Sequence, residues 1–555
     1  MLFLLAVTVR ILVALLTRTS FQPDEYFQAL EPAHDLVFGY GYLTWEWLTP
    51  NPIRSILYPL LNVPVYWILK ATGLDSVHCF LIAGPRLAHG ALAALTDVFL
   101  YKLARRELGP NYANVALFLS LTSPFNALAL SRSLSNSLET SLSTVAYVYY
   151  PWSETNRFLK YVFTSRLRVV LALAALACIV RPTNAVIWIY LFGQLFANRP
   201  DIRVYLIVNA VATGIVALSI QILADSIYYG RLVITPLNFL RANASSVSLF
   251  YGRNNATFYI FEALPVLCAT ALPFALHGIY KSLRNTSSTD SALPKMTRVI
   301  AWTMAVYSLA GHKEWRFIHP LLPLLHILAA KSIVFLSTSS APPTEPSKAR
   351  SRFPVERAHL ALLALGIPTS LYVVLIHNSA PISAVAYLHE MPASVNATNV
   401  VGVLMPCHSM PGQAYLHRPD FANPRVMWSL GCEPPLGLNP EAAASYKDQT
   451  TVFFDSPRQY LVDRFPAEVN ASFPPSPKPF IPPTSAGDLS QDWRHEWPRY
   501  LVLYGALLHH EDVRSLLHHQ GYKEIWSSGE HWWQGSIGPD EERMGGIRVW
   551  RWESK

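Results

Sequence analysis

Two adjacent carboxylates stand near the start of the chain, directly after a proline, in the run Phe21-Gln22-Pro23-Asp24-Glu25-Tyr26-Phe27-Gln28. A carboxylate is a suitable general base, because it can take the proton of a hydroxyl group that attacks an electrophile. Proline and two acids also mark the first turn of a helix, where proline fits and negative charge complements the helix dipole. Continued at helical spacing, the polar side chains form one stripe of Asp24, Gln28, Glu31 and Asp35. The same pattern suits an amphipathic helix at a membrane surface, so both interpretations stand at this point.

A second group of ionisable residues is the run His312-Lys313-Glu314-Trp315-Arg316-Phe317, which lies between two apolar segments. Charged side chains at a membrane surface are costly unless water or a ligand surrounds them. Lys313 and Arg316 are fixed cations that would suit a pyrophosphate or a lipid phosphate. Another cation, Arg181, occurs in the turn Arg181-Pro182-Thr183-Asn184. The alternative is that these cations only extend from helix ends toward water.

Aromatic side chains are concentrated in the run Tyr40-Gly41-Tyr42-Leu43-Thr44-Trp45-Glu46-Trp47. The rings of Tyr42, Trp45 and Trp47 could stack on the apolar faces of sugars. Tyrosine and tryptophan also collect at membrane interfaces because one end of each ring system is polar. The composition of the run does not decide between these roles.

Several familiar nucleotide and metal motifs do not occur in the sequence. There is no Gly-x-x-x-x-Gly-Lys-Ser/Thr, no Gly-x-Gly-x-x-Gly, no His-Glu-x-x-His and no Asp-x-Asp. We therefore expect no metal, no cofactor and no nucleic-acid partner. We expect a phosphate-bearing substrate to be bound by arginine and lysine.

The composition shows what positions these residues. Of 555 residues, 51% are hydrophobic and only 14% are charged, whereas a soluble domain carries about 25% charged residues. These values exclude a disordered chain, a collagen-like chain and a disulfide-rich secreted scaffold. About eleven apolar segments approach the length needed to cross a bilayer. Two of them form a predicted hairpin within Val169–Ala197, and the others are Met1–Thr17, Cys79–Tyr101, Tyr112–Leu130, Ser137–Tyr150, Val204–Ala224, Phe258–Tyr280, Val299–Gly311, Ile318–Leu336 and Ala358–His377.

Two independent signals predict the orientation of these segments. Lysine and arginine are enriched in the loops 102–111, 151–168, 198–203, 281–298 and 337–357, which predicts that these loops are cytosolic. Sequons for N-glycosylation fall on the other side, at Asn243, Asn255, Asn396 and Asn470. Only Asn285-Thr-Ser falls on the predicted cytosolic side. Asp24, the His312–Phe317 run and Arg181 then share the non-cytosolic compartment.

The hydropathy falls after His377, which predicts a transmembrane domain over 1–377 and a non-cytosolic α/β domain over 378–555. We predict strands at Val400–Met405, Thr451–Phe454, Tyr500–Tyr504 and Ile547–Trp552, and a helix at His509–Gln520. Cys407 and Cys432 could form a disulfide, remain free, or bind a metal together with His408 and His417.

The runs quoted above resemble the dolichyl-phosphate-mannose-dependent mannosyltransferases of glycosyltransferase family 22. Pro23–Gln28, Tyr40–Trp47 and Gly311–Phe317 carry the resemblance, with supporting similarity in Arg181-Pro182-Thr183 and Met405-Pro406-Cys407-His408-Ser409. The resemblance implies a polytopic, all-α GT-C-type glycosyltransferase with a small lumenal α/β domain in the endoplasmic reticulum membrane. The Tyr40–Trp47 run is most similar to the branch that adds the third, α-1,2-linked mannose to the glycosylphosphatidylinositol (GPI) anchor precursor.

The resemblance also implies a donor and roles for the residues. The donor would be dolichyl phosphomannose, the acceptor the GPI-precursor glycolipid within the membrane, and the transfer inverting. Asp24 would be the base, with Glu25 as a helper or a substitute. Substrate-binding roles would fall on Gln28, Tyr42, Trp45, Trp47, Arg181, His312, Lys313, Glu314 and Arg316.

Other functions fit part of the sequence. A sister mannosyltransferase could act on the dolichol-linked N-glycan precursor or add the fourth mannose of GPI. A polytopic lipid or solute transporter is an alternative of another class, although its charges should lie near the middle of the membrane. A non-catalytic subunit of a membrane complex is a third alternative.

Overall fold

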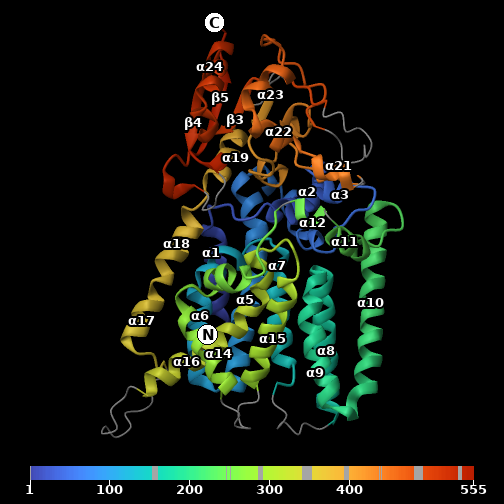
Figure 1. The fold of residues 1–555 in the computed structure, drawn as a ribbon, viewed down its shortest axis with the longest axis vertical. Helices are drawn as coiled ribbons and strands as arrows, with labels where there is room; N and C mark the ends of the chain where they lie inside the picture. Colours follow the sequence, from blue (N-terminus) through green and yellow to red (C-terminus); the bar gives the residue numbers. More distant parts are fainter. Residues whose placement is uncertain are drawn as a thin grey trace.

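The computed structural model describes residues 2–152, 160–245, 247–250, 252–284, 292–339, 353–392, 399–436, 438, 440–480, 492–535 and 541–554. Most of them form a bundle of helices, and a smaller part sits on one end of the bundle and contains a sheet (Figure 1). We call residues 2–375 the bundle and residues 380–554 the cap.

The helices of the bundle are α1 (Leu2–Leu16), α2 (Glu31–Phe38), α3 (Trp45–Leu48), α4 (Val63–Thr72), α5 (His78–Glu107), α6 (Pro110–Thr122), α7 (Ser135–Tyr149), α8 (Lys160–Val180), α9 (Ala185–Asn198), α10 (Arg203–Tyr229), α11 (Thr235–Ala244), α12 (Val247–Phe250), α13 (Leu264–Cys268), α14 (Leu272–Arg284), α15 (Ala292–Ser308), α16 (Leu322–Ser339), α17 (Arg357–Ala364) and α18 (Gly366–Leu375). Those of the cap are α19 (Ala380–Glu390), α20 (Gln413–Leu416), α21 (Pro440–Ser445), α22 (Gln449–Asp455), α23 (Pro457–Arg464) and α24 (Glu511–Gln520).

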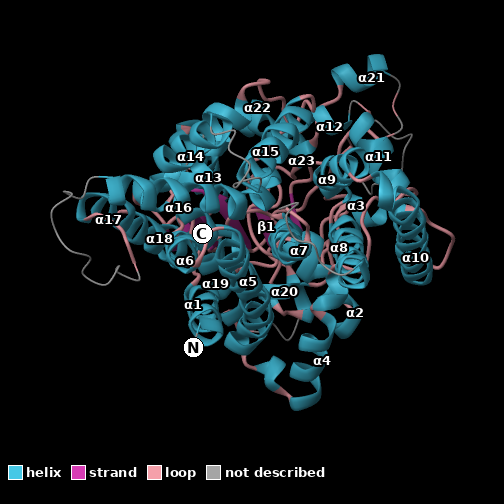
Figure 2. Cartoon of the chain, turned by 90° about the horizontal axis from the view of Figure 1, so that it is seen from below, coloured by secondary structure: helices cyan, strands magenta, loops and turns pink. Residues whose placement is uncertain are grey.

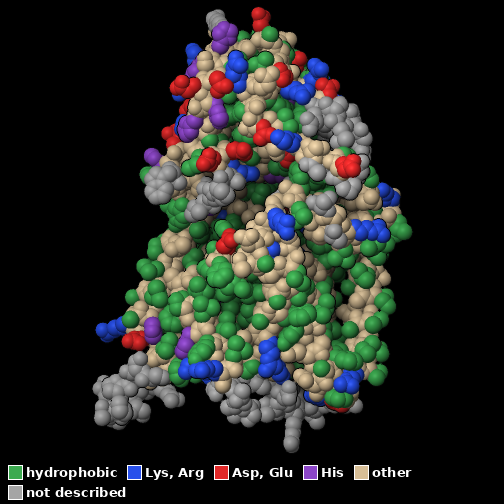
Figure 3. Space-filling model, viewed as in Figure 1, with side chains coloured by type: hydrophobic (Ala, Val, Ile, Leu, Met, Phe, Trp, Pro, Cys, Tyr) green, Lys and Arg blue, Asp and Glu red, His purple; other side chains and the backbone are tan. Residues whose placement is uncertain are grey.

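Every predicted apolar segment coincides with a helix or a run of helices. In the described part of the chain, six of these runs are long and apolar enough to cross a membrane, and Leu2–Leu16 is a shorter apolar helix. Hydrophobic side chains cover the surface of the bundle, whereas charged side chains gather over the cap and at the opposite end (Figure 3). From below, the helices lie in front of the strands, and α10 stands at the margin (Figure 2). The protein is a multi-pass membrane protein.

The predicted hairpin within Val169–Ala197 is confirmed. Helix α8 ends at Val180, a short 3₁₀ turn covers Pro182–Asn184, and α9 runs back from Ala185. Proline fits the first turn of the new helical segment because its nitrogen has no hydrogen to leave unpaired. The turn carries Arg181 to the end of the bundle that faces the cap.

A fully buried ion pair explains the arginine in the middle of the first apolar helix. Arg10 of α1 contacts Asp97 of α5 at 2.7 and 2.8 Å and also donates to the backbone carbonyl of Ser120 in α6. A buried charge is tolerated only when its partners replace water. The pair therefore joins three helices at one point.

The acidic run opens a helix, as predicted, that starts at Asp24, passes through a π-helical turn at Tyr26–Leu30 and continues as α2. The side chains of Gln28 and Glu31 are buried. The interpretation as an exposed helix on a membrane surface is therefore wrong, because the cap and the loop before α3 cover the polar stripe.

The cap contains one mixed sheet in the order β2-β1-β3-β5-β4. Its strands are β1 (Val401–Leu404), β2 (Met427–Ser429), β3 (Tyr500–Tyr504), β4 (Tyr522–Ser528) and β5 (Ile547–Trp552). β1 is parallel to β2 and β3, and β5 is antiparallel to β3 and β4. The predicted strands at β1, β3 and β5 and the predicted helix at α24 are confirmed.

One predicted strand is wrong, because Thr451–Phe454 lies within helix α22. The Asp448 side chain accepts the backbone N–H of Thr451 at 2.6 Å and thereby starts the helix. Phe453 faces the cap core. Strands β2 and β4 were not predicted: β2 is three residues long, and the polar, partly exposed β4 lacks a hydrophobic pattern.

The carboxylate of Glu31 joins the cap to the bundle. One of its oxygens accepts the backbone N–H of Tyr42 at 2.8 Å, and the other accepts that of Ala414 in the cap at 2.7 Å. Burial raises the pKa of Glu31 to about 7, and these hydrogen bonds oppose the rise. This contact fixes the distance between the first loop of the bundle and the Cys407–Leu416 segment of the cap.

Candidate active site

A network of four predicted site residues lies where the bundle meets the cap. The Arg316 guanidinium contacts the Asp24 carboxylate at 2.6 Å and binds both oxygens of Glu314 at 2.7 Å. His312 lies 3.3 Å from Glu314. The start of the acidic helix and the turn before α16 therefore supply one connected set of charges, although 292 positions of the sequence separate Asp24 from Arg316.

Charge pairing fixes the protonation of this network. Burial alone would raise the pKa of Glu314, but Arg316 and His312 hold it well below its usual range. The hydrogen bond to Glu314 raises the pKa of His312. Glu314 is therefore a permanent anion that orients Arg316 toward Asp24.

A second arginine lies beside this network. Arg54 contacts Glu46 at 2.6 and 3.0 Å, and Gln28 donates to the same carboxylate at 3.1 Å. Arg54 lies close enough to Asp24 and Arg316 for their charges to shift its pKa: Asp24 raises it and Arg316 lowers it. The predicted residue Gln28 thus positions Arg54 through Glu46.

Arg181 is the third guanidinium of the site. It lies 3.5 Å from the Glu139 carboxylate of α7 and donates to the Ser135 hydroxyl at 3.1 Å. Burial lowers the pKa of Arg181, Glu139 opposes this, and the nearby Arg316 and Arg54 lower it further. The three guanidiniums therefore repel one another, and an added anion would relieve that repulsion.

A groove opens along these cations. Arg54, Arg181 and Gln28 line it together with apolar side chains of α8 and α11, among them Ile179, Val180 and Phe239. We call it the cationic groove. It combines two guanidiniums with apolar side chains, which is the combination that a lipid phosphate requires.

A larger pocket lies between the loop before α3 and the cap, with about 1500 Å³ of empty space including its open mouth. We call it the aromatic pocket. Its wall from the bundle includes Phe27, Tyr42 and Trp45, and its wall from the cap includes Trp428 and Phe421. Phe27 also packs against His408, with ring centroids 4.7 Å apart. The negative charge of Asp24 raises the pKa of His408, against the larger lowering by burial. The aromatic pocket therefore begins beside Asp24.

Three predicted site residues are engaged elsewhere. Glu25 is buried against Arg132, at 3.1 Å. Lys313 donates to the backbone carbonyl of Asn254 at 3.0 Å. Trp47 is buried and donates its indole N–H to the backbone carbonyl of Phe27 at 2.9 Å. These contacts position the polypeptide around the site.

Comparison with known proteins assigns the family. Residues 1–417 match the model of the family described as "Alg9-like mannosyltransferase family". The chain belongs to the Alg9-like mannosyltransferase family. It is therefore a glycosyltransferase, as the motifs predict.

Individual relatives agree with this assignment. The chain is 37% identical to "GPI mannosyltransferase 3" of Yarrowia lipolytica, over 86% of this chain and 85% of that one. It is 32% identical to the human "GPI alpha-1,2-mannosyltransferase 3", over 84% and 77% of the two chains. In fold it is similar to ArnT from Cupriavidus metallidurans bound to undecaprenyl phosphate, with a TM-score of 0.59, 10% identity, and coverage of 99% and 97%. The GT-C-type architecture is thereby confirmed.

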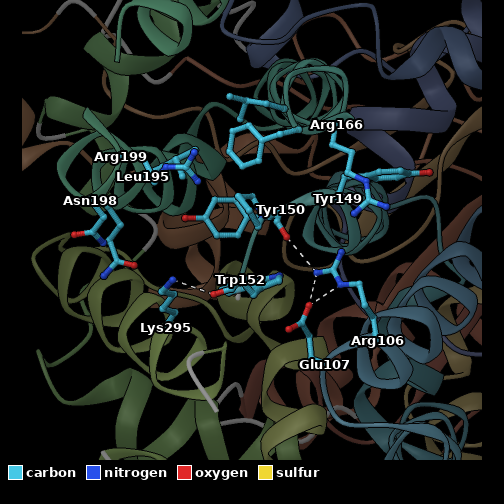
Figure 4. A pocket seen from close by; sticks show the side chains of 14 residues that line it. Arg106, Glu107, Tyr149, Tyr150, Trp152, Arg166, Leu195, Asn198, Arg199 and Lys295 are labelled. Carbon is cyan, nitrogen blue, oxygen red and sulfur yellow. Dashed lines mark hydrogen bonds and ion pairs between the residues drawn. The ribbon is translucent and has the colours of Figure 1, made fainter. Parts of the chain in front are cut away.

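Another basic pocket of this mannosyltransferase lies at the opposite end of α5 (Figure 4). His78, at the start of α5, contacts the Tyr415 carbonyl of the cap, so Arg106 lies about 40 Å away at the helical rise of about 1.5 Å per residue. Arg106 contacts Glu107 and the Tyr150 carbonyl, and Lys295 donates to the Trp152 carbonyl. Arg106 and Lys295 thus already have partners within the protein, and the pocket is remote from Asp24.

Cys407 and Cys432 form a disulfide, with Cα atoms 5.9 Å apart. This excludes them as metal ligands, and His417 instead contacts His34 and Tyr40. Of the predicted glycosylation sites, Asn243, Asn255 and Asn470 are exposed, whereas Asn396 lies outside the described residues.

The prediction from sequence missed Arg54, Glu46 and Glu139 as members of the site. Glu46 stands within the aromatic run, where its proximity to two tryptophans could have indicated a buried, functional carboxylate. Arg54 carries no local signal, because its role depends on Glu46 and on the approach of Arg316. Glu139 sits in an apolar helix, and an ionisable residue in such a helix is itself a signal for function.

Proposed function

We propose that this mannosyltransferase transfers the third, α-1,2-linked mannose from dolichyl phosphomannose to the GPI-anchor precursor, with inversion at the mannose C1. The observation that carries the proposal is the position of Asp24, which Arg316 contacts at 2.6 Å and whose charge acts on Arg54 of the cationic groove and on His408 of the aromatic pocket. The printed names of the relatives support the choice of GPI as the acceptor.

Inverting transfer requires one base on the acceptor side. The acceptor hydroxyl attacks C1 of the β-linked mannosyl phosphate from the face opposite the phosphate. The C1–O bond to the phosphate breaks, and its electron pair leaves with the phosphate. The hydroxyl proton passes to Asp24, which completes the balance. Glu25 cannot share this role from its buried pair with Arg132.

The leaving group needs stabilisation but no acid, because dolichyl phosphate departs as an anion. Arg54 and Arg181 supply that stabilisation from the cationic groove, where low exposure strengthens their field. Ile179, Val180 and Phe239 accommodate the first isoprene units of the lipid. Arg316 positions Asp24 and adds to the positive field.

The acceptor glycan occupies the aromatic pocket. Tyr42 and Trp45 present ring faces, and sugars bind such faces through their apolar C–H surfaces. The cap supplies the other wall, so acceptor binding depends on both parts of the chain. The mannose that receives the new linkage lies at the end beside Phe27 and His408, closest to Asp24.

We place the enzyme in the endoplasmic reticulum membrane with the cap in the lumen. The distribution of lysine and arginine supports this orientation, as do the exposed sequons at Asn243 and Asn255, on the side of the bundle that carries the cap. Dolichol-linked sugars and GPI precursors would then reach the site from the lumenal leaflet.

The test uses membranes from cells that lack the endogenous enzyme, supplied with dolichyl phosphomannose and a GPI precursor carrying two mannoses. We expect conversion to the three-mannose lipid by the wild type. We expect a loss of at least about 10³-fold in rate in Asp24→Asn, since a positioned base contributes about 10²–10⁴-fold. Asp455→Asn is the matched control and should keep full activity, because Asp455 is exposed on the cap and its carboxylate pairs with Lys447.

The other outcomes separate the alternatives. Extension of an N-glycan precursor in place of the GPI precursor would assign the chain to a sister enzyme. Failure with both acceptors would contradict both acceptor assignments and require another acceptor for this glycosyltransferase. Full activity of Asp24→Asn would keep the enzyme and exclude Asp24 as the base.

A further inference from the structure

The aromatic pocket has an unusual charge composition. Its lining includes a single carboxylate, Glu433, and no lysine or arginine. His408, also in the lining, is neutral at physiological pH, because burial lowers its pKa to about 4. Arg543 donates to the Ser409 hydroxyl of the lining at 3.3 Å, on the His408 side of the pocket. At Glu433 itself a phosphate would find no counter-charge, whereas a cation would find one.

Glu433 stands directly after the disulfide cysteine Cys432, and its carboxylate rests against Gly431. In the described part of the chain, no lysine or arginine lies within ion-pair distance of this carboxylate. Burial raises the pKa of Glu433 to about 7; the hydrogen bond from its own backbone N–H opposes the rise, and the neighbouring Asp448 adds to it. The same carboxylate contributes to raising the pKa of Tyr42 across the pocket to about 12, although burial is the main cause.

Other carboxylates of the site region have an arginine or backbone N–H groups of other segments as partners. Glu25 pairs with Arg132, Glu139 pairs with Arg181, and Glu314 pairs with Arg316. Glu31 accepts backbone N–H groups from two segments. The Glu433 carboxylate lines the open pocket and accepts its own backbone N–H, but in the described part of the chain it has no cation beside it. A partly buried anion of this kind costs stability unless a ligand neutralises it.

We propose that Glu433 binds a primary ammonium group of the acceptor glycolipid and thereby selects acceptors that carry such a group. This inference rests on the proposed function and deepens it. The ammonium group would belong to an amino sugar of the glycan core or to an ethanolamine phosphate on one of its mannoses. Both offer a compact cation with three N–H donors, which a carboxylate can accept.

The surroundings of Glu433 favour this ligand over two others. A divalent metal would need several oxygen ligands, and the adjacent Cys432 is held in a disulfide. A neutral sugar hydroxyl could bind Glu433, but it would leave the negative charge uncompensated. The rings of Tyr42 and Trp428 line the same pocket and add a favourable field for a cation.

Glu433 and Asp24 act on different side chains of the pocket: the charge of Asp24 raises the pKa of His408, whereas the charge of Glu433 raises that of Tyr42. The two side chains are neighbours, with ring centroids 6.4 Å apart. The ammonium group would therefore belong to a part of the glycan other than the hydroxyl that reacts. Glu433 should influence acceptor binding and leave the chemical step unchanged.

The test compares two-mannose glycolipid acceptors with a free or an N-acetylated amino sugar, each with and without ethanolamine phosphate. For the wild type we expect the KM of the acceptor to rise about 10- to 100-fold when the recognised amine is blocked or absent, the range expected for a hydrogen bond to a charged group. Only one of the two amines should matter, and the pattern identifies it. In Glu433→Gln the KM should be high for all acceptors, with kcat within about twofold of the wild type.

Glu468→Gln, an exposed acid on the cap, is the matched control and should keep the wild-type preference. Equal KM values for all four acceptors with the wild-type enzyme would overturn the proposal, and this arm does not depend on the folding of any variant. A loss in Glu433→Gln that is independent of the amine would also overturn it. If the wild type converts none of the acceptors, the proposed function itself fails, which is a distinct result.

Discussion

The cationic groove and the aromatic pocket each contain a residue on which the charge of Asp24 acts, Arg54 and His408, but they differ in almost every physical property. The groove carries Arg54 and Arg181 beside a strip of hydrocarbon, whereas the pocket carries aromatic rings and one unpaired carboxylate. Each part suits one half of a transfer reaction: an anionic lipid donor on one side and a sugar acceptor on the other. The difference teaches that the reacting phosphate of the donor has counter-charges in the groove and none beside Glu433, so charge favours one orientation of the two glycolipids.

The contact between Arg316 and Asp24 is where the two sites join, so breaking it should have the largest effect. Arg316→Lys keeps the charge but cannot bind Glu314 with two parallel hydrogen bonds while holding Asp24. We expect kcat to fall about 100-fold or more, with smaller changes in either KM. The single-turnover rate measured with saturating donor and acceptor tests this. A change confined to the KM of the donor would place Arg316 in the groove alone.

Arg54→Gln and Arg181→Gln should separate the groove from the pocket. Each removes one guanidinium from the phosphate site, so we expect the KM of dolichyl phosphomannose to rise about 10- to 100-fold. The KM of the acceptor should stay within about twofold. Arg458→Gln, on the exposed face of α23, is the control. If acceptor binding weakens as much as donor binding, the assignment of the two sites is incorrect.

Trp45→Ala should weaken binding of the acceptor and leave binding of the donor unchanged. Loss of one ring face should raise the KM of the acceptor about 5- to 20-fold, an effect comparable to base or sugar stacking energies of about 1–2 kcal/mol. The donor KM should not change. Trp533→Ala removes a half-exposed cap tryptophan outside both sites and should leave both constants unaltered.

The smallest expected effect is on stability and concerns Glu433. Burial raises the pKa of Glu433 to about 7, so between about pH 4.5 and 7 the folded protein holds a proton that the unfolded chain releases. The free energy of unfolding contributed by this group therefore falls as the pH rises through that window. Without acceptor, Glu433→Gln should melt at the same temperature as the wild type at pH 5 and a few degrees higher at pH 8, by roughly 2–4 °C. A lower melting temperature at pH 8 would mean that the carboxylate already has a stabilising partner.

A site residue of this molecule could be predicted from the sequence where the residues next to it in the chain already indicate its role. Asp24 and Arg316 were predictable because they follow helix starts and turns, where ionisable residues beside apolar segments stand out. The role of Glu25 was not predictable, because only the fold brings Arg132 to it. The same holds for Arg54, whose partners approach from other segments.

In the cap, hydrophobic runs predicted β1, β3 and β5 correctly. The run Thr451–Phe454 was misassigned, since a helix cap at Asp448 outweighs β-propensity there. The aromatic pocket could not be predicted at all, because its two walls come from residues near 45 and residues near 430.

The bond between Glu31 and the Ala414 N–H joins residues that are 383 positions apart. During synthesis α2 is made early, whereas its partner in the cap is made only after most of the remaining helices. The acceptor side of the enzyme is consequently the last part to be completed. A chain that stops before the cap would hold the cationic groove beside only one wall of the aromatic pocket, and we expect it to be inactive until the Cys407–Leu416 segment has been made and packed on Glu31.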